Sequence, residues 1–185
     1  CNELLELLSC LFNGEMRPVL RPTSDIGHYL PYRRVSFGLE ALEQASLGAG
    51  KDFSALLSLK DYPPHATPGM CDALLRLPFE MTLTESFAFV DRQVTLDRMG
   101  RALRRLRAAE DDAFSLREEL AQARDEAGAG RAAYGEHHLS LLVQSEDPVT
   151  LDRAVAEVQS SFAETGAVAV REDVNLEPAY WAQFP

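Results

Sequence analysis

The chain begins with a run of leucines at helical spacing. Leu4, Leu5, Leu8 and Leu11 recur every three or four positions, which predicts an amphipathic helix. Asn13-Gly14 follows at once and is a typical helix end. Three prolines and a glycine between residues 17 and 31 then predict an irregular connector.

Further along the chain, apolar and polar residues alternate with a period of two, which is typical of strands with one buried face. Strands are expected at residues 34–37, 53–60, 79–89, 137–145 and 168–170. The segment 39–45 lies between the first two strands and is predicted to form a helical turn.

Helical periodicity predicts three further short helices. Thr67-Pro68 is a favourable start for the first, which should end near Leu77. Asp147-Pro148 should cap the second, whose apolar stripe reaches Phe162. The third should begin at Asn175 and contain Tyr180, Trp181 and Phe184.

Residues 91–130 contain the longest helical pattern. Apolar residues recur at steps of three and four, which forms a heptad seam with one short step near Ala109. One continuous helix here would be roughly 50 Å long at ~1.5 Å per residue. The alternative is a helical hairpin that breaks near Ala109.

The order of these elements favours an α+β fold. We expect a ferredoxin-like antiparallel sheet of two split β-α-β units, with a long, coiled-coil-like helical insertion between them. The whole of 1–185 is interpreted as one domain. Its parts are a lead-in (1–31), a first unit (32–90), the helical insertion (91–130), a second unit (131–174) and a final helix (175–185).

Composition restricts the function further. Hydrophobic residues make up 46% and the net charge is −11, which is typical of a soluble domain and disfavours nucleic acid or anionic lipid as the main partner. Three widely spaced cysteines provide neither a disulfide framework nor a zinc site. No apolar run is long enough to span a membrane. Because the chain lacks both an initiator Met and a polar tail, we expect it to be part of a longer protein.

The sequence offers little catalytic chemistry. Gly48-Ala49-Gly50-Lys51 resembles a P-loop, but Ala45 replaces its first glycine and Asp52 its hydroxyl residue. We therefore expect this chain to bind no ATP, metal or other small-molecule cofactor. His137 and His138 are adjacent on a strand and point to opposite faces, so they are interpreted as surface residues. No serine or cysteine has a base at a recognisable spacing.

Two features point to binding. The arginines from Arg98 to Arg107 could contact nucleic acid, but no aromatic residue lies among them, and Asp97–Arg101 and Arg107–Asp111 are spaced for ion pairs within the helix. A solvated helix face is therefore favoured over nucleic-acid binding, and contact with an acidic protein surface remains an open alternative. The heptad seam either packs on the sheet or mediates helix–helix association. The candidate protein-interaction residues are the heptad positions Leu96, Met99, Leu103, Leu106, Leu116 and Leu120, together with Trp181 and Phe184 near the end.

Several stretches resemble the CagE/TrbE/VirB family of type IV secretion (conjugative transfer) ATPases, in order and over nearly the whole chain. They lie at residues 13–20, 34–38, 53–63, 68–80, 86–89, 134–139, 168–173 and 177–185.

This resemblance implies a pre-motor, N-terminal region of such an ATPase, with ATP and Mg²⁺ bound in a motor domain that this sequence does not contain. It implies a bacterial protein in the cytoplasm, peripheral at the inner membrane. The implied partners are other ATPase subunits and inner-membrane secretion proteins. We therefore expect a non-catalytic scaffold. A nucleic-acid-binding module using Arg98–Arg107 is the alternative.

Overall fold

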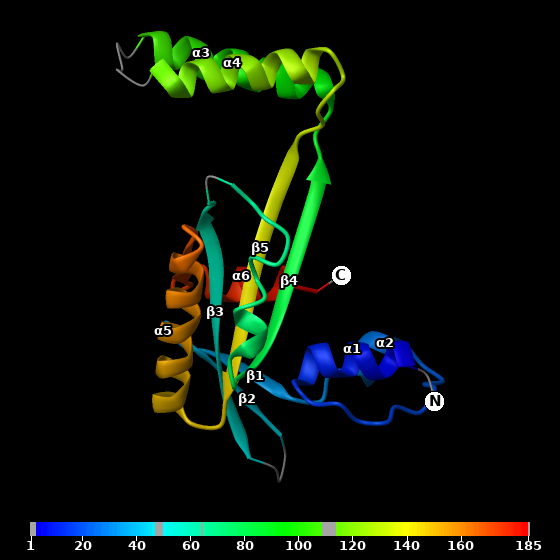
Figure 1. The fold of residues 1–185 in the computed structure, drawn as a ribbon. Coiled ribbons are helices and arrows are strands. Elements are labelled where there is room, and N and C mark those ends of the chain that lie inside the picture. Colours follow the sequence, from blue (N-terminus) through cyan, green and yellow to red (C-terminus); the bar gives the residue numbers. More distant parts are fainter. Residues whose placement is uncertain (1–2, 47–49, 64, 109–113, 185) are drawn as a thin grey trace. The chain divides into compact units, whose positions relative to one another are not determined.

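The computed structural model describes residues 3–46, 50–63, 65–108 and 114–184 (Figure 1). These residues form two compact units. The first unit combines residues 1–84 with 139–185, and the second spans residues 85–138. Each unit is described by itself below.

The first unit contains most of the sheet and its helices. Its elements are α1 (Glu3–Asn13), α2 (Ile26–Tyr29), β1 (Arg34–Phe37), β2 (Leu42–Ala45), β3 (Lys51–Asp61), the 3₁₀ helix η1 (Leu74–Arg76), α5 (Pro148–Glu164), β6 (Val168–Arg171) and α6 (Leu176–Trp181). Strands β4 (Glu80–Phe89) and β5 (Gly135–Ser145) extend from the first unit into the second.

Strand β3 is the centre of the sheet. The strand order is β1-β2-β3-β5-β4, and β6 also pairs with β3. Along one edge of β3, residues 51–54 pair with β2 and residues 57–61 pair with β6. Along the other edge, residues 53–58 pair with β5. These pairings are antiparallel, so the predicted mixture of helices with an antiparallel sheet is confirmed.

The two faces of this sheet carry separate apolar cores. Because side chains alternate along a strand, Leu57 and Leu141 face α5, whereas Leu56 and Leu142 face α6. Helix α5 contributes the predicted stripe of Leu151, Val155, Val158 and Phe162 to the first core. Asp147 caps this helix by accepting a hydrogen bond from the amide of Thr150 (2.8 Å), as the sequence indicates.

The second unit contains α3 (Arg92–Ala108) and α4 (Phe114–Gly128), which lie side by side (Figure 1). The long pattern over 91–130 therefore corresponds to two packed helices in the described residues. The seam positions Ala109 and Ala113 lie outside those residues. Gly100 and Leu103 of α3 are buried, and so is Ala127 of α4.

Two local predictions were wrong. Residues 39–45 contain strand β2 and no helical turn. Gly38 donates a backbone hydrogen bond to Ala41 (2.8 Å), which closes a β1–β2 hairpin, and β2 then pairs with the central strand β3. These tertiary pairings outweigh the weak helical pattern of such a short segment.

The helix predicted from Thr67 is also absent. The structure has turns there, followed by the 3₁₀ helix η1. Gly69 adopts a φ of +80° in what would be the first helical turn, which a right-handed helix does not permit. The isolated leucines Leu74 and Leu77 still pack on the α5-facing core.

Candidate functional site

Aromatic side chains from three distant segments gather at α6. Phe12 stacks on Phe184 with ring centroids 4.8 Å apart, and Tyr180 contacts Phe37, Trp181 and Phe184 edge-on at 5.1–5.5 Å. Such offset and edge-on pairs are the favoured aromatic geometries. We call these five residues the α6 aromatic cluster. Helix α6 ends at Trp181, so Phe184, which was predicted to lie in this helix, lies beyond its end.

The cluster has a buried centre and an exposed edge. Tyr180 is 1% exposed, whereas Trp181 is 49% exposed. Gln44 donates a hydrogen bond to the phenol of Tyr180 (3.0 Å). Burial raises the pKa of Tyr180, and the bond from Gln44 opposes this in part, so the phenol remains protonated near neutral pH. The buried tyrosine thus fixes the position of the exposed indole beside it.

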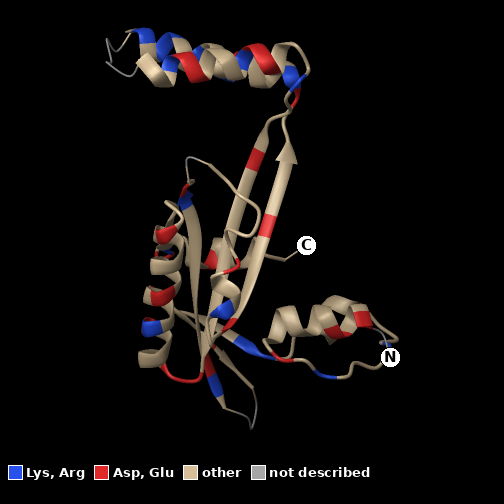
Figure 2. Ribbon diagram, in the orientation of Figure 1, with Lys and Arg blue, Asp and Glu red and all other residues tan. Residues whose placement is uncertain are grey.

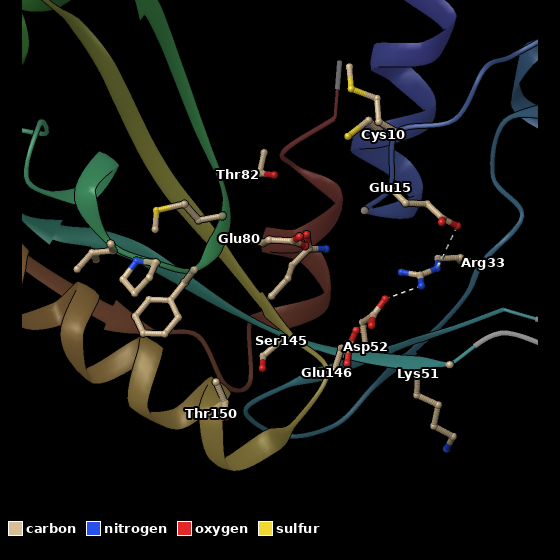
Figure 3. A pocket seen from close by; sticks show the side chains of 18 of the residues that line it. Cys10, Glu15, Arg33, Lys51, Asp52, Glu80, Thr82, Ser145, Glu146 and Thr150 are labelled. Carbon is tan, nitrogen blue, oxygen red and sulfur yellow. Dashed lines mark ion pairs between the residues drawn. The ribbon is translucent and has the colours of Figure 1, made fainter.

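A cavity of about 1220 Å³ lies elsewhere in the first unit (Figure 3). Apolar lining residues come from the segment 74–81, and charged residues come from several elements. Figure 3 shows the Arg33 side chain directed toward Glu15 and Asp52. Glu15, Asp52, Glu80 and Glu146 supply four carboxylates to the lining, while Arg33 and Lys51 supply the positive charge.

The central arginine of this cavity already has partners. Arg33 pairs with Asp52 at 2.5 Å and approaches Glu15 to 4.0 Å. The phenol of Tyr32 donates a hydrogen bond to Glu15 (2.5 Å), which, with the charges of Arg17 and Arg33, lowers the pKa of that carboxyl despite its desolvation. Desolvation, followed by the bond to Glu15, raises the pKa of Tyr32 to about 12.

These interactions give the cavity a structural role. They connect the end of α1, strand β1 and the start of β3. Asn13 reinforces the connection, since its buried amide accepts hydrogen bonds from the backbone of Tyr32 (3.0 Å) and Arg33 (3.2 Å). No cluster of three or more possible metal ligands occurs in the part of the chain that the structure describes.

The second unit contains the heptad candidates. Leu103 is buried within the helix pair and is not available to a partner while the helices are packed. Leu96, Met99, Leu106 and Leu120 are partly buried, and Leu116 is half-exposed. Leu106, Leu116 and Leu120 line a groove between α3 and α4, which the structure therefore assembles from the two halves of the predicted seam.

Of the two ion pairs expected within the helix, the pair of Asp97 with Arg101 does not form among the described residues. Gln93, not Arg101, contacts Asp97, with Nε2 donating to the carboxylate at 3.3 Å. Arg98 instead pairs with Glu136 of β5 at 2.6 Å. The predicted pair of Arg107 with Asp111 involves a residue outside those that the structure describes.

The remaining candidate motifs are the adjacent histidines and the segment that resembles a P-loop. His137 lies 3.5 Å from Glu85 and near Phe87, and His138 is exposed. Gly48 and Ala49 lie outside the described residues, while Lys51 begins strand β3 and pairs with Glu43 at 3.0 Å. This lysine therefore lies on a strand, whereas a P-loop lysine lies where a loop opens a helix.

Sequence reasoning missed the cavity residues and Gln44. Arg33 and Glu15 come from segments predicted as irregular or unassigned, and the glutamine lies in the segment predicted as a helical turn. The only local signal for Gln44 is its position in an alternating stretch, Leu42 to Ala45, which is too short to identify a strand.

None of the helices in the described ranges has the length and apolarity needed to cross a bilayer.

Comparison with known proteins identifies a family for this chain. The model of the CagE, TrbE, VirB family, a component of the type IV transporter system, matches residues 1–185. The type IV secretion system protein virB4 of Bartonella quintana (strain Toulouse) is 35% identical over 184 residues, covering 100% of this chain and 23% of the relative.

Two further relatives are similar to nearly the whole chain. Protein virB4 of Agrobacterium tumefaciens (strain 15955) is 31% identical and covers 99% of this chain. Type IV secretion system protein PtlC of Bordetella pertussis (strain Tohama I) is also 31% identical and covers 98%. The chain spans about a quarter of the length of each, 23% and 22% respectively. On this evidence, the chain belongs to the CagE, TrbE, VirB family of type IV secretion components.

Proposed function

We propose that this chain is a non-catalytic docking region of a type IV secretion ATPase. It connects the motor to the other subunits and to the inner-membrane components of the secretion system, at the cytoplasmic side of the membrane. ATP and Mg²⁺ are bound by the motor, outside this chain. The family match over residues 1–185 supports the secretion role, and the absence of a P-loop sequence supports the non-catalytic role.

For the fold, we propose a ferredoxin-like arrangement with a helical insertion. The order β6-β3-β5-β4 supports it, because the strands of the two β-α-β units, β3 with β4 and β5 with β6, alternate in the sheet. Helix α5 makes the crossover of the second β-α-β unit, whereas the turns and η1 replace the helix of the first β-α-β unit. Helices α3 and α4 follow β4 and precede β5, the position of the short link in the simple fold.

The observation that carries the docking proposal is the exposure of Trp181. Its side chain is 49% exposed, although the ring centroids of Tyr180, Phe37 and Phe184 lie 5.1–6.1 Å from that of the indole. An indole held rigidly at a surface loses little conformational entropy on binding, and tryptophan is enriched among the residues that dominate protein interfaces. Trp181 therefore suits a partner surface that buries the indole.

The proposal is tested by competition in cells that carry the parent secretion system. An excess of this chain should occupy docking positions and reduce transfer of the secreted substrate. Trp181→Ala should require roughly thirtyfold more chain for the same inhibition, because removal of an interface tryptophan typically costs about 2 kcal/mol or more. Tyr29→Ala removes another exposed aromatic side chain from the first unit and is the matched control.

Two results would contradict this function. A folded, abundant chain that leaves transfer unchanged would show that it occupies no docking position. Hydrolysis of Mg·ATP by the purified chain would show that it is catalytic.

The second candidate function is nucleic-acid binding by α3. The charge of this helix favours it, because α3 contains six arginines and one acidic residue, Asp97. Binding through phosphates should weaken steeply with added salt. A fluorescence titration with labelled single- and double-stranded DNA measures this directly, and absence of binding at low salt would remove the candidate.

A further inference from the structure

A groove of about 590 Å³ runs between α3 and α4 in the second unit. Its apolar residues are Ala102 and Leu106 of α3 together with Leu116 and Leu120 of α4. Among the described residues that line it, the charged ones are Arg98, Arg101 and Arg105, which are basic and belong to α3. We call this feature the α3–α4 groove. It combines an apolar surface with a positive border on one side.

The charge of this border differs in sign from that of the whole chain, whose net charge is −11. Figure 2 shows both basic and acidic residues along the helix pair. Arg98 has a local partner in Glu136. In the described part of the chain, Arg101 and Arg105 form no ion pair, and both are exposed. Two positive charges at the groove are thus available to an acidic ligand.

The apolar residues of the groove favour a protein helix over nucleic acid. Leu116 is 49% exposed, and phosphates and sugars gain little from contact with a leucine. Bases bind single-strand proteins by stacking on aromatic rings, and none of the described residues that line this groove is aromatic. A third helix, in contrast, packs readily along the groove between two others, with its apolar side chains inserted between theirs.

We propose that the α3–α4 groove binds an acidic amphipathic helix of a partner protein. Leucine-like side chains of that helix, spaced three and four residues apart, pack on Leu106, Leu116 and Leu120. Carboxylates along one side of the helix pair with Arg101 and Arg105, which supply charge-assisted hydrogen bonds. This inference rests on the proposed docking function and specifies the chemistry of one partner.

The test measures binding of a defined peptide to the complete 185-residue chain. The probe is a capped, fluorescein-labelled peptide of leucine, alanine and glutamate, roughly 18 residues and therefore about 27 Å long as a helix. Its leucines share one face and its glutamates flank them. A scrambled peptide of identical composition, whose leucines no longer share a face, is the control ligand. Fluorescence anisotropy should detect binding of the ordered peptide only.

Matched charge variants locate the site. Arg101→Glu with Arg105→Glu reverses two groove charges and should weaken binding by roughly tenfold or more. Arg104→Glu with Arg107→Glu makes the same change in net charge on the same helix, outside the groove, and should weaken binding by less than about threefold. Leu116→Ser should weaken binding by roughly fivefold, since it removes apolar contact without changing the charge.

Each alternative has its own outcome. Equal weakening by the two charge variants, or equal binding of the scrambled peptide, would show a diffuse charge effect and overturn the proposal. Tighter binding of a single-stranded DNA of roughly 20 nucleotides, with the same loss in both charge variants, would assign the helix to nucleic acid. Self-association of the chain that the groove variant abolishes would make a second copy the occupant.

Folding and the wider docking function are controlled separately. Far-UV circular dichroism must show that the charge variants retain the helicity of the unmodified chain, and Leu116→Ser repeats the test at an exposed position where folding is little affected. The Trp181 competition assay does not depend on the groove. Inhibition of transfer by a chain that does not bind the peptide would therefore overturn this inference alone. If neither the unmodified chain nor Trp181→Ala inhibited transfer, the docking function itself would be overturned.

Discussion

Gln44 and Tyr180 are hydrogen-bonded across 136 positions of sequence, with Nε2 of the glutamine 3.0 Å from the phenol oxygen. Both side chains are buried, and Gln144 extends the link by donating to Oε1 of Gln44 at 3.4 Å. The bond joins β2 to α6, so it connects the strand that sequence analysis missed to the helix that presents Trp181.

Removal of the phenol tests this link. Tyr180→Phe leaves the buried amide of Gln44 without its acceptor and should lower the free energy of unfolding by about 1–2 kcal/mol. Urea unfolding followed by tryptophan fluorescence measures the change, since Trp181 lies beside the substituted ring. Tyr29→Phe alters an exposed tyrosine and should have little effect. An unchanged urea midpoint for Tyr180→Phe would show that the bond contributes nothing.

Alkaline pH tests the raised pKa of Tyr32. This pKa is about 12 in the folded chain, against an ordinary value of 10.0. Between these values the unfolded chain loses the phenol proton first, so stability is fully present below pH 10 and decreases as pH rises toward 12. Tyr32→Phe should therefore lose less stability than the unmodified chain over this pH range. Urea midpoints measured from pH 9 upward test it, and parallel curves for the two proteins would contradict the prediction.

The caps of α5 and α6 provide a paired prediction. Asp147 accepts a hydrogen bond from the amide of Thr150, whereas the side chain of Asn175 makes no capping bond. Asp147→Ala should therefore lower the melting temperature by roughly 2–4 °C, and Asn175→Ala should lower it much less. Differential scanning calorimetry at pH 7 provides the comparison. Equal shifts for the two variants would show that the Asp147 bond does not stabilise α5.

The same cap predicts an acid dependence. Hydrogen bonds from Thr150 lower the pKa of Asp147 below 3.8. A depressed folded pKa contributes stability above the unfolded value, and this contribution is lost as pH falls through the folded value. The difference between Asp147→Ala and the unmodified chain should therefore shrink below about pH 4. A difference in melting temperature that remained constant to pH 2 would contradict this prediction.

The helix pair distinguishes a buried from an exposed leucine. Leu103→Glu places a carboxylate at a position that is 6% exposed and should destabilise the packing of α3 on α4 by about 3 kcal/mol or more. Leu116→Glu alters a half-exposed position on the facing helix and should leave this packing largely intact. Hydrogen exchange of the α3 and α4 amides reports the difference. Similar protection in both variants would show that Leu103 does not hold the pair together.

The sequence predicts those elements whose signals are local. Strand β5 and helix α5 follow a clean period and a capping sequence, and both form as predicted. Strand β2 was missed because four residues carry too little periodicity, and pairing with β1 and β3 determines its conformation. The helix from Thr67 was predicted but does not form. The positive φ of Gly69 interrupts a segment whose leucines are spaced for a helix.

For the candidate sites too, the sequence indicated residues that share a local pattern and missed those that only the fold brings together. The heptad pattern indicated leucines that the structure brings to the α3–α4 groove, and Trp181 stood out by its residue type. The pattern alone did not distinguish Leu103, which is buried, from Leu116, which is half-exposed. The contacts of Arg33 with Glu15 and Asp52 join distant segments with no shared period, so only the folded sheet reveals the cavity.

The central position of β3 affects the order in which the chain can fold during synthesis. Ala55 of β3 pairs with Val143, and Leu57 pairs with Arg171, whereas all of residues 85–138 lie between these partners in sequence. At ribosomal speeds of about 5–20 residues per second, β3 waits on the order of 5–20 s for β5. During that interval β2 pairs only with residues 51–54 along one edge, so most of the backbone groups of β3 stay unpaired until the ribosome delivers β5 and β6.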